Sequence, residues 1–400
     1  MSSKRYQSYY PSRRILMGPG PSDVPTAVLE ALSRQTIGHL DPEFVQLMEA
    51  IKSLLQTVFQ TQNPLTLPLS APGSAGMEFC LVNLLEAGDK VIICQNGVFG
   101  GRMLEIADRI GARSVAIQDE WGQPVDLNKV AEAVREHPDA KLIAFVHAET
   151  STGARSDAES ISKLAHDHGM LVLADTVTSL GGIPVEVDAW QLDAVYAGSQ
   201  KCLSCVPGLS PVTLSERAIE QINKRRTKVQ SWFLDVKLLL GYWGSDSRRS
   251  YHHTAPVNSL AALHASLTLL VSEGLPAAFA RHMLHHRALA AGLQKLGIEF
   301  LVSESDRLPM LNSVLVPDGL NEAAVRRQLL DHYGIEIGAG LGALAGKTWR
   351  IGLMGHSARS ANVYSLITAL ESILIQSGCG RQIETGAALT QVQQIYESST

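Results

Sequence analysis

The stretch Leu171-Val-Leu-Ala-Asp-Thr-Val177 decides the fold class of this chain, because a run of apolar and β-branched residues ends abruptly in a carboxylate. A second apolar run, Asp193-Ala-Val-Tyr-Ala197, leads into the polar turn Gly198-Ser-Gln-Lys201. Both runs predict buried strands, and each is followed by a polar or charged side chain. The segment between them is long enough for one helix and one return strand. We therefore expect Asp175 and Lys201 to lie at the same edge of a mostly parallel sheet, where the sites of such sheets gather.

The alternation of strands and helices extends outward from these two runs. Short apolar runs predict further strands, and stretches with helical periodicity separate most of them. Such alternation is typical of an α/β fold, in which helices cover both faces of a mostly parallel sheet. The predicted strands cover residues 65–69, 91–94, 114–117, 141–146, 170–174, 193–197 and 211–214, and the predicted helices include 101–110, 127–136 and 158–168.

The length of 400 residues exceeds what one hydrophobic core usually serves, so we expect a large and a small domain. After residue 275 the pattern becomes that of a small α+β domain. It predicts helices over 277–296, over 322–333 and up to about 375, and strands over 299–302, over 312–316 and around Trp349. The expected boundaries are an N-terminal arm over 1–22, a large domain over 23–273, a small domain over 274–376 and a loosely packed tail over 377–400.

The composition describes a compact protein with an ample core, since 45% of the residues are hydrophobic and 18% are charged. The net charge of −5 argues against a nucleic-acid partner, and no apolar run approaches the roughly 20 residues of a membrane helix. Five cysteines, an odd number, favour a reducing compartment, and we expect the cytoplasm. The basic N-terminus is expected to lie over a partner subunit, with a transit peptide as the alternative.

Lys201 and Asp175 together indicate a cofactor. Pyridoxal phosphate (PLP) is an aldehyde that a lysine holds as an imine, and a carboxylate keeps its ring nitrogen protonated. Taken singly, Lys201 could be a surface lysine and Asp175 the N-cap of a helix. As a pair at one edge of a sheet, they favour a PLP site.

The turn Ser70-Ala-Pro-Gly-Ser-Ala-Gly-Met-Glu78 follows a predicted strand and precedes a helix expected over 77–85. Small residues at the N-terminus of a helix leave backbone N–H groups open to a phosphate. Gly73, Ser74 and Ala75 are the candidate donors. The alternative is an ordinary turn between a strand and a helix.

Two further side chains stand in surroundings that call for an explanation. Phe99 lies between glycines just after a strand, where it would either stack on a flat ring or fill the core under a loop. Arg350 lies inside the apolar run Trp349-Arg-Ile-Gly-Leu-Met354 and needs a carboxylate partner. That partner is either the α-carboxylate of a substrate, bound by the guanidinium fork, or the acid of a structural salt bridge.

Other patterns carry less weight. The motif Cys202-Leu-Ser-Cys205 has no second cysteine pair beside it, and no redox-type context supports it. His282, His285 and His286 share a helical face without an acidic motif, so we expect no metal site. The glycines of Gly338-Ala-Gly-Leu-Gly342 are not followed by a helix and do not form a dinucleotide-binding fingerprint.

Several stretches of this chain together resemble the class V PLP-dependent aminotransferases, which have the aspartate aminotransferase fold (fold type I). The similarity is greatest to the alanine–glyoxylate and serine–pyruvate aminotransferases and spans about residues 15–374. The stretches that carry it are Leu16-Met-Gly-Pro-Gly-Pro-Ser22, Val58-Phe-Gln-Thr-Gln-Asn-Pro-Leu-Thr-Leu67, Glu149-Thr-Ser-Thr-Gly153, Asp175-Thr-Val-Thr-Ser-Leu-Gly-Gly182, Gly198-Ser-Gln-Lys201, Tyr251-His-His-Thr-Ala-Pro-Val257 and Arg350-Ile-Gly-Leu-Met-Gly355.

The resemblance implies a large domain with a mostly parallel seven-stranded sheet, a small C-terminal α+β domain and PLP as the cofactor. It also implies roles for individual residues. Lys201 would be the Schiff-base lysine and the proton shuttle. The remaining cofactor contacts would be Asp175 at the ring nitrogen, Thr150 at the ring hydroxyl, Phe99 stacked where close relatives have a tryptophan, Val177 at the ring, and Gly73, Ser74, Ala75 and Gln200 at the phosphate.

The resemblance further implies a homodimer, because Tyr251 and Thr254 would reach the phosphate of the neighbouring subunit. On the substrate side, Arg350 would bind the α-carboxylate and Thr150 would lie close by. The backbone at Pro19 and Gly20 would line the pocket, and His39 would influence specificity. The phosphate turn departs from the Ser-Gly-Ser-Gly-His form of some relatives, so its donors are less well defined.

The expected reaction is a ping-pong transamination between a small amino acid, alanine or serine, and glyoxylate or pyruvate. Alternative donors are (S)-ureidoglycine, 3-hydroxykynurenine and taurine; Tyr251, where we expect asparagine in the ureidoglycine enzymes, argues mildly against the first. A cysteine desulfurase would need a late mobile cysteine, and only Cys379 comes late in the chain. A PLP-fold protein kept for binding or assembly is the alternative outside enzymology. The preferred donor, the pathway and any association beyond a dimer are not defined by these residues.

Overall fold

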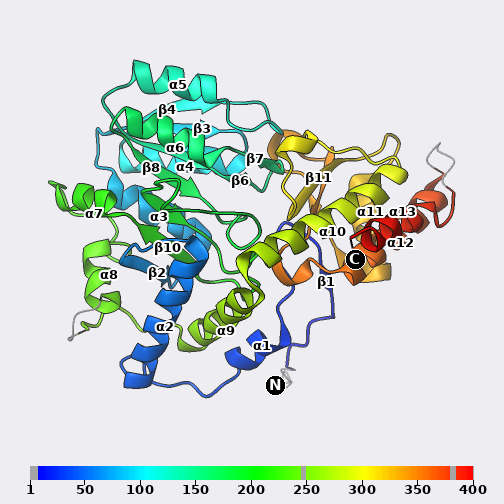
Figure 1. Ribbon diagram of the computed structural model, residues 1–400, viewed down its shortest axis with the longest axis horizontal. Helices are drawn as coiled ribbons and strands as arrows, with labels where there is room; N and C mark the ends of the chain where they lie inside the picture. Colours follow the sequence, from blue (N-terminus) through cyan, green and yellow to red (C-terminus); the bar gives the residue numbers. More distant parts are fainter. Residues whose placement is uncertain (1–7, 245–248, 379–383, 400) are drawn as a thin grey trace, which may run out of the picture.

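A seven-stranded sheet forms the centre of the large domain in the computed structural model, which describes residues 8–244, 249–378 and 384–399 (Figure 1). Only β10 runs antiparallel to its neighbours, and the other pairings are parallel. The predicted fold class, a mostly parallel seven-stranded sheet in an α/β domain, is thereby confirmed. The strand order is β2 (Leu65–Leu69), β10 (Ser210–Leu214), β9 (Ala194–Tyr196), β8 (Leu171–Asp175), β5 (Ala140–Val146), β3 (Lys90–Gln95) and β4 (Arg113–Gln118).

Helices connect these strands and pack against them. Helix α3 (Gly73–Leu84) lies on β9 and β10, while α4 (Val98–Ile110) lies on β3, β4 and β5 and also contacts α3. Helices α5 (Leu127–Glu136) and α6 (Ala158–Asp167) contact each other and pack on β4 and β8 respectively, and α2 (Pro42–Phe59) packs on β2. Strands β5 and β8 at the centre of the sheet are buried along nearly their whole length, which explains their apolar sequences, whereas the edge strand β4 is largely exposed.

Helix α3 begins at Gly73, whereas the sequence predicted a helix from residue 77. Pro72 precedes the first helical residue in an extended conformation, and the next three residues already belong to the first turn. Periodicity misplaced this start because glycine, serine and alanine contribute little apolar signal. The correction matters for function, since the expected phosphate turn is the N-terminus of a helix.

The small domain contains a three-stranded antiparallel sheet in the order β11 (Leu311–Leu315), β14 (Thr348–Gly352) and β13 (Gly338–Ala339). Trp349 is fully buried in its core, which is covered by α10 (Leu275–Lys295), α11 (Glu322–Tyr333) and α12 (Ser360–Ser377). The strand predicted over 299–302 is not formed. Phe300 makes only an isolated bridge to Val314, so this prediction is wrong.

The C-terminal residues form a packed helix rather than the loose tail that the sequence suggested. Helix α13 (Ala387–Glu397) contacts α10 and α12 (Figure 1). Ala388 and Val392 lie one helical turn apart and are both buried in the small-domain core. Leu389, Ile395 and Tyr396 pack partly buried against the same core, so the helix carries an apolar face that the sequence analysis overlooked. Cys379, the late cysteine considered above, lies outside the described residues.

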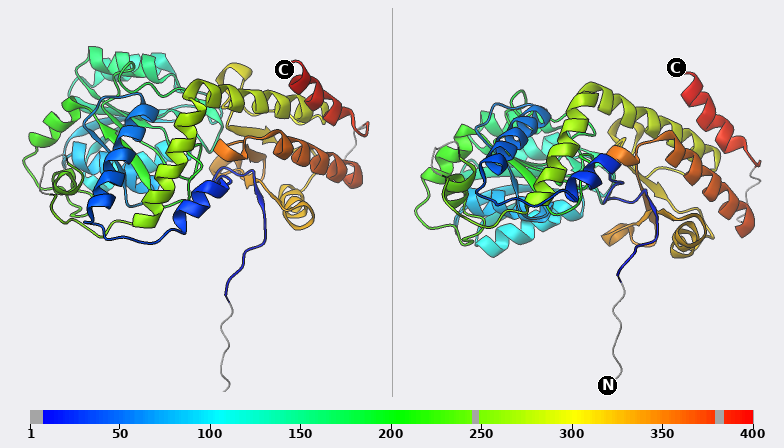
Figure 2. Two further views of the ribbon diagram at one scale, coloured as in Figure 1. Left: turned by 60° about the horizontal axis from the view of Figure 1, so that its bottom comes forward. Right: turned by 90° about the horizontal axis from the view of Figure 1, so that it is seen from below.

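The N-terminal segment belongs to the small domain before it enters the large one. Strand β1 (Ile15–Leu16) pairs in parallel with β12 (Ile335–Glu336), and Met17 is buried in the small-domain core. Figure 2 shows the described residues before β1, 8–14, extending away from both domains. The expectation that this arm covers a partner subunit stays a prediction.

Two helices join the domains, α9 (Val257–Glu273) and α10, and they meet at Gly274 with a bend of 86°. Within the described residues, no helix alone has the length and apolar character needed to cross a bilayer. The bent pair α9–α10, taken as one segment, meets the length and composition criteria for a membrane span, and nothing beyond length and composition supports it.

Replacing Gly352 with alanine is expected to destabilise the protein. A Cβ atom at this position would lie 1.9 Å from the carbonyl oxygen of Gly18, which is backbone and cannot rotate away. Overpacking of this kind costs about 1–3 kcal/mol of unfolding free energy, and denaturant titration would measure it. The matched control is Gly38→Ala, where the nearest atom would be 4.0 Å from the new Cβ. Equal stability of both variants would contradict the close packing of these segments.

Candidate active site

A cavity of about 270 Å³ lies where the carboxyl ends of β8 and β9 meet the N-terminus of α3. It brings together residues that are far apart in sequence but were predicted to act together. Asp175 and Lys201 both line it, as the sheet topology required. The complete lining is Pro72, Gly73, Ser74, Met77, Phe99, Arg102, Thr150, Asp175, Val177, Tyr196, Gln200 and Lys201.

Lys201 is a buried lysine, with 8% of its surface exposed. Its Nζ donates a hydrogen bond to the carbonyl of Pro19, and a Cβ atom on Gly20 would lie 2.7 Å from that nitrogen. Ser22 fixes the segment, because its Oγ donates to the Lys201 carbonyl at 2.9 Å and its N–H to that of Gln200 at 2.9 Å. The backbone predicted to line the substrate pocket therefore lies directly over the amine.

Burial lowers the pKa of Lys201 from its ordinary value of 10.5 to about 8, and the positive charge of Arg350 acts in the same direction. Desolvation disfavours the ammonium form, so a substantial fraction of the side chain is neutral at mildly alkaline pH. A neutral amine is the form that attacks an aldehyde. The surface-lysine alternative does not fit this environment.

Asp175 ends β8 and is buried, with both carboxylate oxygens hydrogen-bonded. The hydroxyl of Tyr196 donates to Oδ2 at 2.6 Å and the N–H of Val177 donates to Oδ1 at 2.8 Å. Burial nevertheless raises the pKa of Asp175 to about 6, against the opposing effect of these bonds. A carboxylate destabilised by desolvation gains most from a nearby cation, such as a protonated ring nitrogen.

Tyr196 was missed by the sequence analysis, although the strand pattern contains the signal. It stands opposite Asp175 in the parallel pair of β8 and β9. Residues opposite each other in neighbouring strands project to the same face. A polar ring at the end of β9, level with a strand-end carboxylate, is therefore a foreseeable partner.

Arg350 is buried in β14 without an acidic partner. Its Nε donates to the carbonyl of Ala339 at 2.7 Å and its Nη1 to that of Thr150 at 3.2 Å. Among the residues that the structure describes, no carboxylate lies within salt-bridge distance of it. Burial lowers its pKa to about 10, while the more distant charge of Glu149 opposes the shift. The structural salt bridge considered above is absent, so the guanidinium is left to pair with an incoming carboxylate.

Glu149 is a second residue that the sequence analysis passed over. Its carboxylate is buried and accepts hydrogen bonds from the Ser151 N–H at 3.0 Å, the Ser151 hydroxyl at 2.6 Å and the Phe99 N–H at 3.1 Å. Burial raises its pKa, although these bonds act in the opposite direction. The last bond fixes the first turn of α4, and with it the aromatic ring of Phe99 at the cavity wall. Thr150, the next residue, shares a hydrogen bond of 2.6 Å with Thr178.

The expected phosphate end of the cavity is formed by the first turn of α3. Gly73 and Ser74 line it, but Ala75 does not, and the Ala75 N–H already donates to the Pro72 carbonyl at 2.7 Å. Gln200 places a buried side-chain oxygen here that has no hydrogen-bond partner. The helix N-terminus fits an anionic ligand, and the amide oxygen of Gln200 is left to accept a hydrogen bond from a ligand that carries a donor.

His39, Tyr251 and Thr254 form a separate group that does not line this cavity. The rings of His39 and Tyr251 are 5.4 Å apart, and the hydroxyls of Tyr251 and Thr254 are 3.5 Å apart. Tyr251 is 62% exposed. That Tyr251 and Thr254 contact the cofactor phosphate of a neighbouring subunit stays a prediction.

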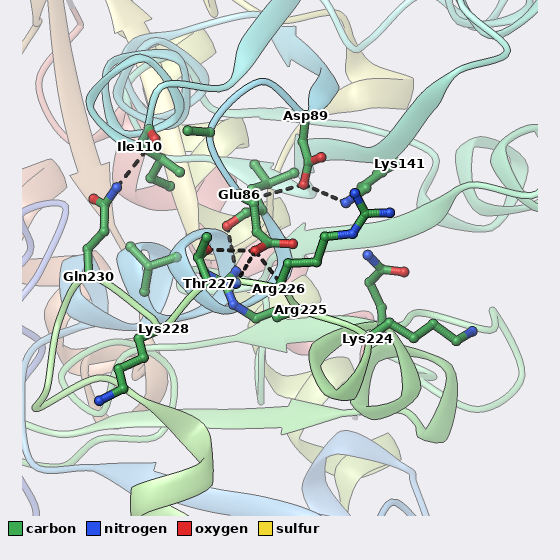
Figure 3. Close-up of a pocket in the computed structure, with 14 residues that line it drawn as sticks. Glu86, Asp89, Ile110, Lys141, Lys224, Arg225, Arg226, Thr227, Lys228 and Gln230 are labelled. Atoms are coloured by element: carbon green, nitrogen blue, oxygen red, sulfur yellow. Dashed lines mark hydrogen bonds and ion pairs between the residues drawn. The ribbon is translucent and has the colours of Figure 1, made fainter.

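A larger cavity, of about 630 Å³, lies at the other end of α3 (Figure 3). Its two carboxylates are already engaged. Glu86 accepts from the hydroxyl and the N–H of Thr227 at 2.6 and 2.8 Å, and Asp89 pairs with Lys141 at 2.7 Å. It holds no buried lysine opposite a strand-end acid, so the smaller cavity is the candidate active site.

The residues of the smaller cavity fit PLP. An amine of lowered pKa faces a buried carboxylate across it, an aromatic ring forms part of its wall, and a helix N-terminus closes the far end. A side chain on Gly73 would already be within 3.2 Å of Val177, so the lining there must be small.

Comparison with known proteins gives a consistent result. Residues 15–363 match the family described as aminotransferase class V. The chain is 41% identical over 363 residues to the alanine–glyoxylate aminotransferase of Oryctolagus cuniculus, which covers 90% of this chain and 92% of that protein.

Solved structures agree with the sequence match. An alanine–glyoxylate aminotransferase from Nostoc sp. superposes with a TM-score of 0.91 at 46% identity, covering 92% of this chain and 97% of that one. A ureidoglycine–glyoxylate aminotransferase from Bacillus subtilis superposes with a TM-score of 0.95 at 36% identity, covering 98% of this chain and all of the other.

The substitution Arg350→Met is expected to raise the pKa of Lys201 in the cofactor-free protein. The arginine charge disfavours the ammonium form, so its removal shifts the titration from about 8 toward the ordinary value and leaves less neutral amine at pH 8. The measurement is the rate at which an amine-selective reagent modifies Lys201, followed by peptide mass spectrometry across a pH series. Arg327→Met, at an exposed ion pair, serves as the control. A profile that does not move, or moves toward lower pH, would refute the coupling.

Proposed function

Because the chain belongs to the class V aminotransferases, we propose that it transfers the amino group of a small amino acid, alanine or serine, to glyoxylate or pyruvate. The enzyme is a PLP-dependent aminotransferase. The observation that carries the choice of substrates is the similarity to alanine–glyoxylate aminotransferases over nine-tenths of the chain. The backbone of Pro19 and Gly20 over Lys201 supports a small substrate, because it leaves little space above the amine.

Different residues of the cavity would bind different parts of the cofactor. Asp175, held by Tyr196, would face the ring nitrogen, and Phe99 and Val177 would lie along the ring. Gly73, Ser74 and Gln200 would hold the phosphate. Bound there, PLP supplies an electron-accepting pyridinium ring that delocalises the negative charge left on the substrate when its α-proton departs.

The chain's own groups would orient the substrate and move its proton. Arg350 would bind the α-carboxylate, because its guanidinium is buried, unpaired with any described acid and fixed by the carbonyls of Ala339 and Thr150. Lys201 Nζ would take the proton from the α-carbon and hold it, for which a pKa lowered to about 8 is suited. Pro19 and Gly20 would exclude bulk water from that side.

A homodimer with shared active sites is part of this proposal. Tyr251 is exposed, and neither it nor Thr254 lines the cavity of its own subunit, which leaves both available to a neighbouring subunit. Both can donate hydroxyl hydrogens to a phosphate. We place the enzyme in the cytoplasm, a proposal supported by its four described cysteines, which are buried and unpaired.

Ureidoglycine–glyoxylate transamination is the second candidate. It is supported by the superposition on the Bacillus subtilis enzyme of that name over 98% of this chain. The exposed Tyr251 remains the residue that argues against it. The two functions share the glyoxylate half-reaction, so only the donor distinguishes them.

Purified protein is expected to carry an absorption band near ~420 nm that moves toward ~330 nm when its amino donor is added and returns with glyoxylate. L-Alanine and L-serine should give the largest shift, because a small side chain fits beneath Pro19 and Gly20. Ureidoglycine, 3-hydroxykynurenine and taurine are tested in parallel, and Lys201→Ala serves as the inactive control. A larger response to one of these three donors would overturn the proposed substrate.

Mixing Lys201→Ala subunits with Thr254→Asp subunits is expected to restore activity that neither variant has alone. In a mixed dimer one site combines an intact Lys201 with an intact Thr254, while the other site carries both changes. Random association of equal amounts would return roughly a quarter of the unmodified activity. The readout is glycine formation after co-refolding. No recovery, although mixed dimers form, would argue that each subunit builds its site alone.

A further inference from the structure

The expected phosphate end of the active site lacks a basic side chain of its own. Residues 71–76 read Ala-Pro-Gly-Ser-Ala-Gly, and Gln200, whose side-chain oxygen has no partner, is neutral. A bound phosphate monoester carries close to two negative charges at neutral pH. Helix dipoles and neutral donors compensate part of that charge, but a nearby cation contributes more.

Only two cationic side chains line the cavity within the described part of the chain, Lys201 and Arg102. Lys201 is committed to the opposite end, where it faces Pro19 and Asp175. Arg102 lies on α4 three residues after Phe99, so the two side chains share one face of the helix. Arg102 belongs to no ion pair among the described residues, and its charge is therefore free to serve a ligand.

Arg102 is held by two contacts that both lead to the cofactor cradle. Its guanidinium carbon lies 4.9 Å from the centroid of the Phe99 ring, and its Nη1 donates to Ser74 Oγ at 2.9 Å. The Ser74 hydroxyl oxygen is thereby occupied as an acceptor. Its hydrogen has no acceptor among the described residues and is free to donate, and a donor polarised by a cation is a stronger one.

We propose that Arg102 is a phosphate-binding residue for the cofactor, acting through its charge and through the Ser74 hydroxyl that it polarises. The inference rests on the PLP assignment. Arg102 would supply the positive charge that the phosphate turn itself lacks. Through Arg102, the ring-stacking residue Phe99 is connected to the phosphate-binding residue Ser74. Phe99 positions the guanidinium in turn, since a planar cation stacks on an aromatic ring.

The test compares the binding of PLP with that of pyridoxal, which lacks the phosphate, to the cofactor-free protein. For Arg102→Met we expect the dissociation constant for PLP to rise roughly 10- to 100-fold, the range of a lost hydrogen bond to a charged group. The constant for pyridoxal should change less than about twofold, because Phe99 and Asp175 remain in place. Arg102→Lys keeps the charge without the planar fork and should lie between the two.

Arg109→Met is the matched control, because Arg109 lies on the same helix but pairs with Glu105 away from the cavity. It should leave both constants unchanged. Inorganic phosphate offers a second readout: it should compete with PLP for the unsubstituted protein, and more weakly for Arg102→Met. Unchanged PLP binding in Arg102→Met would overturn the inference, as would an equal loss of PLP and pyridoxal, which indicates a structural role. Failure of the unsubstituted protein to bind PLP would overturn the cofactor assignment itself.

Discussion

The burial of one amine governs the arrangement of the site. A lysine ammonium withdrawn from water is costly unless it is neutralised or paired, and Lys201 has no carboxylate in contact. Burial and the positive charge of Arg350 favour the neutral amine, while the carbonyl of Pro19 accepts its hydrogen bond and the backbone of Gly20 covers it. The N-terminal segment contributes the backbone over the amine and the small domain contributes Arg350, while Lys201 itself follows β9 of the central sheet. The reactive state of the amine therefore depends on all three parts of the fold being in place.

The charges of the site are separated in a way that suits an incoming ligand. Asp175 is an acid made less acidic by burial, and Arg350 is a cation made less basic by burial. Neither has an oppositely charged partner in contact. Each would be stabilised by a complementary charge, the acid by a cationic ring nitrogen and the arginine by a carboxylate. Burying these two charges destabilises the ligand-free protein, and a ligand with complementary charges relieves that destabilisation when it binds. A preorganised site of this kind therefore favours such ligands over others.

The sequence was informative where side-chain chemistry and strand ends coincide. The pairing of Asp175 with Lys201 followed from two apolar runs, and most strands and helices followed from their periodicity. The residues that were not predicted depend on contacts between segments that are distant in sequence. Tyr196 reaches Asp175 because of the strand register, and Glu149 accepts a hydrogen bond from the backbone of α4. Arg102 reaches the cavity because it shares a helical face with Phe99. The start of α3 was missed because small residues carry little apolar signal, whereas the apolar face of α13, with Leu389, Val392 and Ile395, was present in the sequence and was overlooked.

The path of residues 15–22 sets an order in which the site can be completed. Strand β1 pairs with residues 335–336, and the segment that follows reaches Lys201 only after passing Gly352. During synthesis at the ribosome, β1 therefore cannot pair until residues 335–336 have been made. The central sheet can form first, because its strands lie between residues 65 and 214, but the amine remains open until the small domain exists. Competence to bind substrate is thus a property of the nearly finished chain, and any nascent or prematurely ended product would expose an unprotected lysine.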